Sequence, residues 1–191
     1  MDRGLNILIV GVGGQGTLLA SRILGSVATD LNYDVKVSEV HGMSQRGGSV
    51  VTYVRLGESV FSPLIEKGEA DIIIAFELLE AYRWLDHLKE GGKFIINKQR
   101  IDPMPVIMGK QEYPAEILEK LDALNIDVIP VDALDIAKNC GNIKAVNTVL
   151  IGVLAKLTGI EKKVWIDSLN DNIKKAFVDL NLKAFECGYS L

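Results

Sequence analysis

The sequence predicts a three-layer α/β/α fold of the Rossmann-like kind, with a mostly parallel sheet and one strand that is a candidate for antiparallel pairing. Short apolar runs alternate along the chain with stretches in which apolar residues recur at helical spacing. The last part of the chain carries helical patterns only, which predicts a helical C-terminal region. Alternating strands and helices favour a sheet covered on both faces, and such sheets bind ligands beyond the carboxyl ends of their strands.

The first part of the chain predicts a strand, a glycine turn and a helix. Residues 5–10 form a short run of branched apolar residues that ends at glycine, as expected for a strand buried on both faces. From Gly14 to about Leu31, apolar residues recur at helical spacing, so a helix begins inside the glycine cluster. Residues 34–40 predict a second strand, and the alternating residues 49–56 predict a strand at an edge or in antiparallel pairing.

The middle of the chain repeats the alternation of strand and helix. Residues 71–76 predict another buried strand, and a helix that carries Tyr82 and several leucines follows it. Residues 93–97 predict the next strand. Residues 99–113 hold two prolines and have no clear period, so we expect a connector that contains one short strand.

The rest of the chain predicts one more strand and several helices. Residues 114–124 predict a helix with proline in its first turn, 126–131 a strand, 133–139 a short helix and 145–157 a strongly apolar helix. Residues 158–161 have the Thr-x-x-Glu form of a capping box. A single helical face is then expected from Ile166, Leu169, Ile173, Phe177 and Leu180.

Length, charge and composition limit the possible functions. The chain has 191 residues, of which 48% are hydrophobic and 24% charged, which suits one domain with a substantial core. A net charge of −4 without a basic block argues against nucleic acid or an anionic membrane as a partner. The apolar runs are shorter than the roughly 20 residues that a membrane helix needs.

The two cysteines, Cys140 and Cys187, lie far apart in the sequence. Neither belongs to a Cys-x-x-Cys pair, so the usual spacing of a metal or cluster site is missing. The simplest expectation is a reduced, cytoplasmic protein.

The first glycine cluster has the spacing of a phosphate-binding turn. Gly11, Gly13 and Gly16 match the pattern G-x-G-x-x-G, with the preceding strand and following helix that the pattern requires. Backbone amides at the start of such a helix attract an anion. Gly14 and Gln15, which lie inside the pattern, add a further small residue and a polar amide. The alternative interpretation is a tight turn that holds no ligand.

A second glycine-rich segment, residues 41–48, separates two expected strands. Arg46 can form paired hydrogen bonds to a phosphate or carboxylate, and the neighbouring glycines let a ligand approach the backbone. The alternative is a surface loop in which Arg46 pairs with Glu39. The candidate ligand-binding residues of this segment are Ser44, Gln45, Arg46, Gly47 and Gly48.

Other polar residues leave alternatives open. Glu39 lies where a nicotinamide enzyme places the acid that binds ribose, so a self-sufficient NAD(P)- or flavin-dependent oxidoreductase is a second hypothesis. His41 is the only candidate catalytic residue near the loop, and no full catalytic set follows. Glu77 either faces the ligand crevice or favours a helix N-terminus. We expect Asn147 to be a satisfied polar group within its helix.

With both glycine segments considered together, the chain resembles the gamma-type subunits of the 2-oxoacid:ferredoxin oxidoreductases. The stretch from Glu39 to Val50 is the most specific part of the resemblance. The matching segments are Gly11 to Gly16, Glu39 to Val50, Phe76-Glu77 with Glu80-Ala81, and Gly141-Asn142 leading to Asn147. Within the family, the resemblance is closest to enzymes of indolepyruvate or related arylpyruvates. It implies that residues 1–191 form one gamma-type domain.

The resemblance implies a reaction that this chain does not perform alone. In that family a 2-oxoacid is decarboxylated oxidatively and joined to coenzyme A, and two electrons pass through iron–sulfur clusters to ferredoxin. Thiamine diphosphate carries the carbanion chemistry. The present sequence has no Cys-rich cluster motif and no Gly-Asp-Gly segment of the kind that holds thiamine diphosphate through magnesium. A large partner subunit is therefore implied, which holds thiamine diphosphate, magnesium and the clusters.

The resemblance also implies that the glycine segments face coenzyme A or the shared active site. Phosphate or pantetheine groups are expected to contact Gly11, Gly13, Gly14, Gln15 and Gly16. The same cleft is expected to be lined by Ser44, Gln45, Arg46, Gly47 and Gly48. No catalytic residue and no metal ligand is assigned to this chain. A nucleotide-sensing or scaffold module is a third, non-enzymatic hypothesis.

Overall fold

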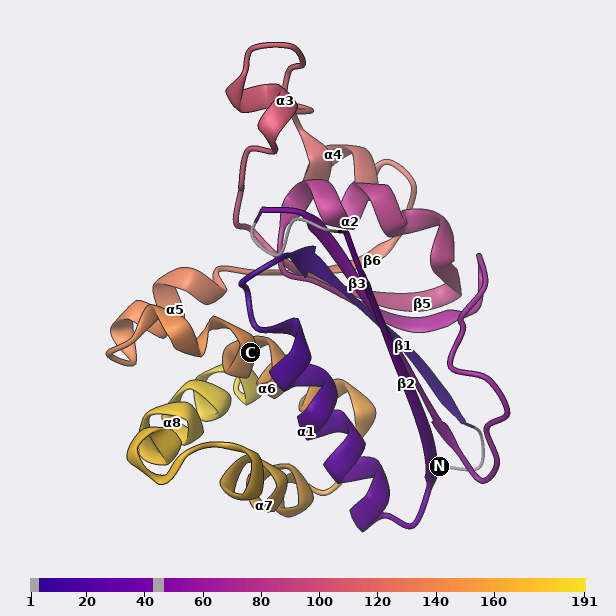
Figure 1. The fold of residues 1–191 in the computed structure, drawn as a ribbon, viewed down its shortest axis with the longest axis vertical. Coiled ribbons are helices and arrows are strands. Elements are labelled where there is room, and N and C mark those ends of the chain that lie inside the picture. The colour runs from indigo at the N-terminus through magenta and orange to yellow at the C-terminus, as the bar shows by residue number, and fades with distance from the viewer. Residues whose placement is uncertain (1–3, 43–46) are drawn as a thin grey trace.

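A computed structural model describes residues 4–42 and 47–191, and its centre is a six-stranded sheet in the order β2-β3-β1-β4-β5-β6 (Figure 1). β3 runs antiparallel to both of its neighbours, whereas β1, β4, β5 and β6 pair in parallel. The sequence prediction of a mostly parallel sheet with one antiparallel strand is therefore confirmed. The strands are β1 (Leu5–Val12), β2 (Asp34–His41), β3 (Ser49–Gly57), β4 (Ala70–Ala75), β5 (Leu88–Asn97) and β6 (Asp127–Val131).

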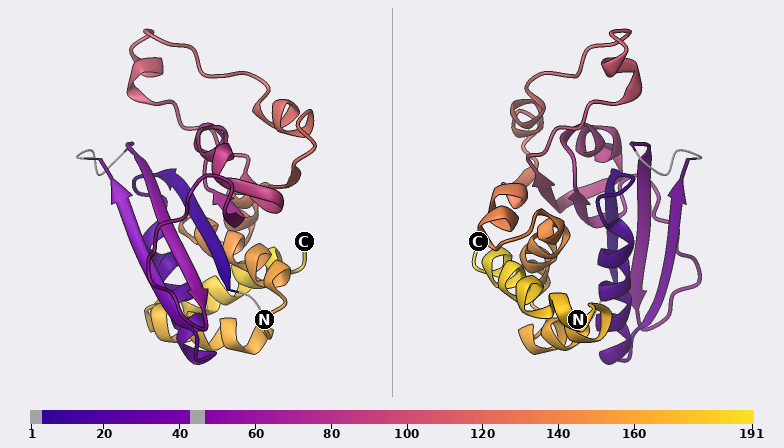
Figure 2. Two further views of the ribbon diagram at one scale, coloured as in Figure 1. Left: turned by 90° about the vertical axis from the view of Figure 1, so that its right-hand side faces the viewer. Right: turned by 60° about the vertical axis from the view of Figure 1, so that its left-hand side comes forward.

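Helices cover both faces of the sheet, as the three-layer prediction requires. One face is covered by α1 and by the C-terminal helices α5 to α8, and the other by α2 and α4 (Figures 1 and 2). The helices are α1 (Thr17–Asp30), α2 (Leu78–Trp84), α3 (Met104–Ile107), α4 (Ile117–Asp122), α5 (Ala133–Asn139), α6 (Val146–Thr158), α7 (Lys162–Asn172) and α8 (Val178–Tyr189). None of the helices in the described ranges has the length and apolar character needed to cross a membrane.

The core has two parts because β1 is buried on both of its faces. Successive side chains of a strand point to opposite faces, so Ile7 and Ile9 pack into the layer of α1, α6 and α8. Leu8 and Val10 pack into the layer of α2 and α4. All four side chains are fully buried. This explains why the first strand is a continuous apolar run.

α6 and α8 pack closely because each has a glycine at the contact. A Cβ atom added to Gly152 would overlap the Phe185 carbonyl oxygen, and one added to Gly188 would overlap the Val149 carbonyl oxygen. The two backbones therefore approach each other more closely than any residue with a side chain would allow. This contact fixes α6, the helix whose N-terminal turn approaches the first glycine cluster.

Three local predictions were wrong. Thr158 is the last residue of α6 and not a cap, because its hydroxyl donates to the Ala155 carbonyl and α7 begins only after Glu161. The single helical face after residue 166 is divided between α7 and α8, since Ile173 has extended backbone angles. The connector 99–113 contains the short helix α3 and no strand.

We predict that Gly188→Ala lowers the free energy of unfolding by about 1–3 kcal/mol, because the new methyl group forces α6 and α8 apart. Gly25→Ala is the matched control. Gly25 lies within α1 with open space around its Cβ position, so alanine should stabilise the protein by about 0.5–1 kcal/mol through helix propensity. Urea unfolding of both variants measures the difference. An equal effect at the two sites would contradict the packing argument.

Candidate functional site

The first glycine cluster forms the turn between β1 and α1 at the carboxyl edge of the sheet. The predicted order of strand, glycine turn and helix is confirmed, but β1 continues to Val12, and α1 begins at Thr17, just after the glycine cluster and not inside it. Gly14 and Gly16 have φ angles of 101° and 89°, in the left-handed region that favours glycine. A Cβ atom on Gly16 would also lie 2.9 Å from the Asn147 side-chain nitrogen of α6. The turn therefore needs glycine for its backbone angles and for its contact with α6.

α1 presents its N-terminus to the turn without a side-chain cap. Gly16 is the N-cap residue, and the first turn of α1 holds no acidic residue. The Gly16 carbonyl accepts hydrogen bonds from the amides of Leu19 and Ala20. Amides earlier in the helix face the turn, where the helix dipole favours an anion by about 0.3–1 kcal/mol for an exposed charge. This end of α1 has the features of a phosphate-binding turn.

The Gln15 side chain forms hydrogen bonds within the protein. Its Oε1 accepts a hydrogen bond from the Val12 amide at 2.8 Å, and its Nε2 donates to the Phe76 carbonyl at 2.9 Å. Nε2 also lies 3.3 Å from the Gln99 Oε1. Gln15 thus joins the carboxyl end of β1 to the residue that follows β4. Its predicted contact with a ligand stays a prediction, and these internal bonds are a structural role that the sequence did not indicate.

Gly47 and Gly48, the last residues of the second glycine segment, lie directly against the first glycine cluster. The Gly13 amide donates to the Gly48 carbonyl at 2.8 Å, and the Gly47 amide donates to the Gly13 carbonyl at 3.4 Å. These bonds continue the antiparallel pairing of β1 and β3, in which Val12 lies opposite Ser49. The structure therefore brings Gly47 and Gly48 to the turn. Ser44, Gln45 and Arg46 lie outside the described residues.

Two cavities flank the glycine turn. One has a volume of about 370 Å³ and includes Glu39 and His41 of β2 together with the start of α1. The other, of about 430 Å³, lies between the turn and the start of α6. The first is lined by Gly13, Gly14, Gly16, Thr17, Leu18, Glu39, His41 and Val50. The second is lined by Gly14, Gln15, Gly16, Gln99, Leu134, Ile143, Lys144, Val146 and Asn147. Gly14 and Gly16 contribute to both cavities.

The second cavity contains functional candidates that the sequence did not single out. Lys144 supplies an exposed cation beside the turn, and Gln99 comes from the connector after β5. Asn147 is buried, and its Oδ1 accepts from the Thr148 amide at 2.9 Å. The expectation that Asn147 is a satisfied polar group holds for this oxygen. Lys144 belongs to no motif, so only the proximity of α6 to the turn identifies it.

Glu77 has a structural role outside these cavities. It is buried at the N-cap position of α2, and its Oε2 accepts from the Glu80 amide at 3.0 Å. Its Oε1 accepts from the Ile101 amide at 3.0 Å and the Tyr113 hydroxyl at 2.6 Å. Burial and the bond to Glu77 raise the pKa of Tyr113, so this hydroxyl stays a donor. Of the two alternatives, the structure supports the helix N-terminus.

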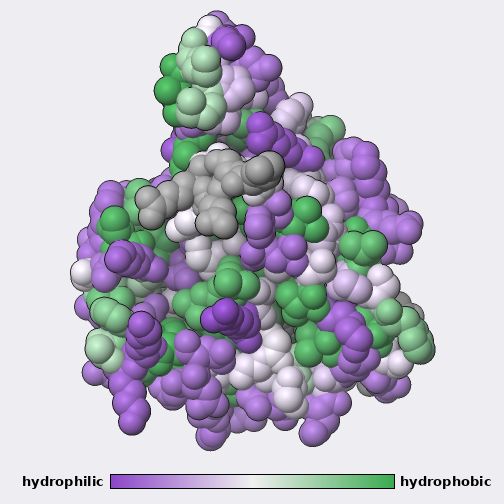
Figure 3. All heavy atoms as spheres, viewed as in Figure 1, coloured by the Kyte–Doolittle hydropathy of each residue, from purple (hydrophilic) through white to green (hydrophobic). Residues whose placement is uncertain are grey.

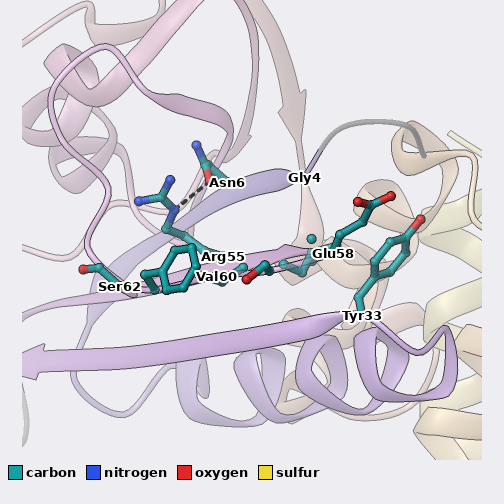
Figure 4. Close-up of a pocket in the computed structure, with 11 residues that line it drawn as sticks. Gly4, Asn6, Tyr33, Arg55, Glu58, Val60 and Ser62 are labelled. Carbon is teal, nitrogen blue, oxygen red and sulfur yellow. Dashed lines mark hydrogen bonds between the residues drawn. The ribbon is translucent and has the colours of Figure 1, made fainter.

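A third cavity lies at the opposite end of the sheet. It has a volume of about 520 Å³ and surrounds the end of β3, near Tyr33 (Figure 4). Its one guanidinium group, that of Arg55, donates to Asn6 Oδ1 at 3.0 Å and to the Leu64 carbonyl at 2.8 Å. Because α/β sheets bind ligands at the carboxyl ends of their parallel strands, and because Arg55 is held by internal bonds, the glycine turn is the stronger candidate.

The strand order differs from that of dinucleotide-binding domains. In those domains the strand that carries the ribose-binding acid lies beside β1. Here β3 separates β2 from β1, so Glu39 is about one strand spacing, roughly 5 Å, farther away. Glu39 Oε2 also accepts from the Thr52 hydroxyl at 3.2 Å. Glu39 still lines the first cavity, but the arrangement that binds dinucleotides is not reproduced.

The fold and the turn define a Rossmann-like α/β domain with a phosphate-binding type of turn at the carboxyl edge of its sheet. Residues 6–191 match the pyruvate ferredoxin/flavodoxin oxidoreductase family, and the chain belongs to that family. Indolepyruvate oxidoreductase subunit IorB of Thermococcus kodakarensis is 40% identical over 188 residues, which are 96% of this chain and 93% of that protein. The chain is therefore a subunit of a 2-oxoacid:ferredoxin oxidoreductase.

Two solved structures share the fold. The gamma subunit of a keto/oxoacid ferredoxin oxidoreductase from Geobacter sulfurreducens has a TM-score of 0.73 and 24% identity, and the match covers 97% of this chain and 96% of that chain. The 2-oxoglutarate:ferredoxin oxidoreductase from Magnetococcus marinus, solved with 2-oxoglutarate, coenzyme A and succinyl-CoA bound, has a TM-score of 0.74 and 20% identity. That match covers 100% of this chain and 31% of the longer chain.

We predict that Gln15→Ala lowers the free energy of unfolding by about 1–3 kcal/mol, because it removes the side-chain acceptor of the Val12 amide and one of the two donors to the Phe76 carbonyl, which keeps its bond from Asn97. Gln99→Ala is the control. Its Oε1 accepts only longer bonds, each of 3.3 Å, from Gln15 and Asn97, so its cost should be under about 1 kcal/mol. Thermal and urea unfolding check both variants. A stable Gln15→Ala protein that had lost only ligand affinity would refute the structural role.

Proposed function

We propose that this chain is the small subunit of an indolepyruvate or arylpyruvate:ferredoxin oxidoreductase and that its glycine segments form part of the coenzyme A cleft. The observation that carries the proposal is the pair of backbone hydrogen bonds that joins Gly13 to Gly47 and Gly48 beside the N-terminus of α1. The three glycines and the start of α1 form an edge at which the backbone is accessible, and such an edge suits a ligand that carries phosphate. The identity to the Thermococcus kodakarensis subunit supports indolepyruvate as the substrate.

The proposed role of this chain is to bind and orient. The amides at the start of α1 and the Lys144 ammonium would attract the phosphate groups of coenzyme A. Gly13, Gly14 and Gly16 would let the ligand approach the backbone. The predicted ligand contact of Gly11 is not part of the proposal, because Gly11 is buried and lines neither cavity, and a Cβ atom there would meet Gln15 and Phe76. Arg46, with Ser44 and Gln45, is proposed to line the same cleft on the basis of its sequence motif. No catalytic acid or base on this chain is part of the proposal.

The remaining chemistry is proposed to reside on a large partner subunit in the cytoplasm. The chain has two cysteines in all, whereas an iron–sulfur cluster requires four cysteine ligands in most proteins. Within residues 4–42 and 47–191, no three metal-binding side chains lie together. Thiamine diphosphate, bound on the partner, would supply the carbanion chemistry of the decarboxylation. Ferredoxin would receive its electrons through the complex.

A protruding arm supports the presence of that partner. Residues 102–112, called the arm, extend away from the body of the domain and carry α3 (Figures 1 and 2). Met104, Ile107 and Met108 lie on one face of this helical turn and are 62%, 65% and 56% exposed. Figure 3 shows hydrophobic side chains gathered on the arm. We propose that the large subunit covers this apolar tip.

Co-expression with a large subunit that holds thiamine diphosphate and iron–sulfur clusters tests the proposed function. The complex should reduce a viologen dye with indolepyruvate and coenzyme A, and omission of this chain should abolish that activity. An unchanged rate without this chain would refute the proposal. Micromolar binding of NADH, NADPH or a flavin to the isolated chain would instead favour the self-sufficient oxidoreductase.

We predict that Leu18→Glu weakens coenzyme A binding to the complex by about 1–2 kcal/mol, roughly five- to thirtyfold. Leu18 is 47% exposed in the first turn of α1 and lines the first cavity, so a carboxylate there opposes the ligand phosphates. Leu18→Gln, of the same size but neutral, should bind nearly normally. Because an acid at a helix N-terminus is favourable, the Glu variant should unfold at the same or a higher temperature. Calorimetric titration that finds the two variants equal would contradict a phosphate at this end of α1.

We predict that Ile107→Glu weakens assembly with the large subunit at least tenfold, because it places a charge in the proposed apolar contact. Leu124→Glu is the matched control. Leu124 is 58% exposed, follows α4 and lines a cavity with residues of β5 and of the start of β6, none of which belongs to the arm. Both variants should fold like the native chain by circular dichroism. Gel filtration and titration of the partner measure assembly. If the two variants assembled equally well with the large subunit, the arm would not be part of the interface.

A further inference from the structure

The two cysteines of the chain lie side by side in the fold. The Sγ atoms of Cys140 and Cys187 are 3.6 Å apart, although 47 positions separate the residues in the sequence. Cys140 is the C-cap residue of α5, and Cys187 lies in α8. Both thiols are free in this structure. Neither the glycine turn nor the proposed coenzyme A cleft uses them, so this dithiol is a separate feature of the molecule.

The two thiols have different surroundings. Cys140 is buried and belongs to the core, whereas Cys187 is partly exposed. The Cys140 thiol donates to the sulfur of Cys187. Burial and this bond raise the pKa of Cys140, and the nearby charge of Lys183 acts in the opposite direction. Solvent therefore reaches Cys187 first, while Cys140 is placed to react second.

We propose that Cys140 and Cys187 form a reversible intramolecular disulfide by exchange with a low-molecular-weight disulfide. The Cys187 thiolate attacks one sulfur of that disulfide, forms a mixed disulfide and releases the first small thiolate. The Cys140 thiolate then attacks the Cys187 sulfur and releases the second small thiolate. The two cysteine thiols lose two electrons and two protons, and the small disulfide gains both electrons and becomes two thiols. Excess small thiol reverses the exchange.

The bond would tie the end of α5 to α8. Cys140 directly precedes the segment that turns into α6 and carries Lys144, a residue of the second cavity. The Gly141 and Asn142 amides donate to the Lys138 and Ala137 carbonyls, which joins this segment to the last turn of α5, next to Cys140. Oxidation would therefore fix one wall of the second cavity to the C-terminal helix. A closed loop would also constrain the unfolded chain and so stabilise the fold.

The test is a redox titration of the full native chain at fixed ratios of oxidised to reduced glutathione. Because the chain has two cysteines, thiol counting and intact mass assign every product. We expect both thiols to disappear in a single transition without bound glutathione. We expect the oxidised chain to unfold at a higher urea concentration than the reduced chain. Restoring reduced glutathione should recover both thiols.

Single variants separate the two steps. Cys140→Ser should retain glutathione on Cys187, because the second thiol is missing. Cys187→Ser should stay unmodified under native conditions, because Cys140 is buried. Circular dichroism confirms that each variant is folded. The proposal is overturned if the native chain accumulates glutathione as Cys140→Ser does, or if oxidation yields only dimers linked between chains. Failure here would leave the proposed coenzyme A cleft unaffected, since no coenzyme A is used.

Discussion

The antiparallel pairing of β3 with β1 determines the geometry of the whole carboxyl edge. In a purely parallel sheet, the segment after β2 would have to cross the sheet before the next strand. Here the chain turns back directly, and β3 pairs with β1 from Leu5 to Val12. The hydrogen bonds of Gly13 with Gly47 and Gly48 extend that pairing past the last strand residue. Two glycine segments that are distant in the sequence therefore meet, and both cavities of the site form beside them.

The neighbouring polar residues hold this edge together. Gln15 ties the turn to the end of β4, and one oxygen of Glu77 accepts bonds from Ile101 and Tyr113, the two residues that flank the arm. Buried groups that accept several hydrogen bonds are costly to disrupt. The same carboxylate caps α2. At this edge, residues that are hydrogen-bonded within the protein therefore support two exposed features, the glycine turn and the apolar tip of the arm.

Much of this arrangement could be predicted from the sequence. The strands, α1 and the turn followed from period and glycine spacing, because a strand buried on both faces and an amphipathic helix leave clear local patterns. The structural role of Gln15 and the places of Lys144 and Gln99 beside the turn could not be predicted, because they depend on contacts between distant elements. The prediction of a capping box at residues 158–161 was wrong for a related reason. Thr158 satisfied a local pattern, but its hydroxyl bonds back into α6, and the start of α7 follows from packing.

The antiparallel pairing of β2 with β3 has a consequence for folding. The hairpin is local in sequence and pairs along its full length, so it can form early. Gly47 and Gly48 meet Gly13 only after β3 docks on β1, and β1 must also pair with the more distant β4. Closing such long loops is slow. We therefore expect the proposed ligand-binding edge to form with the last contacts of the sheet, so that a partly folded chain would not present it.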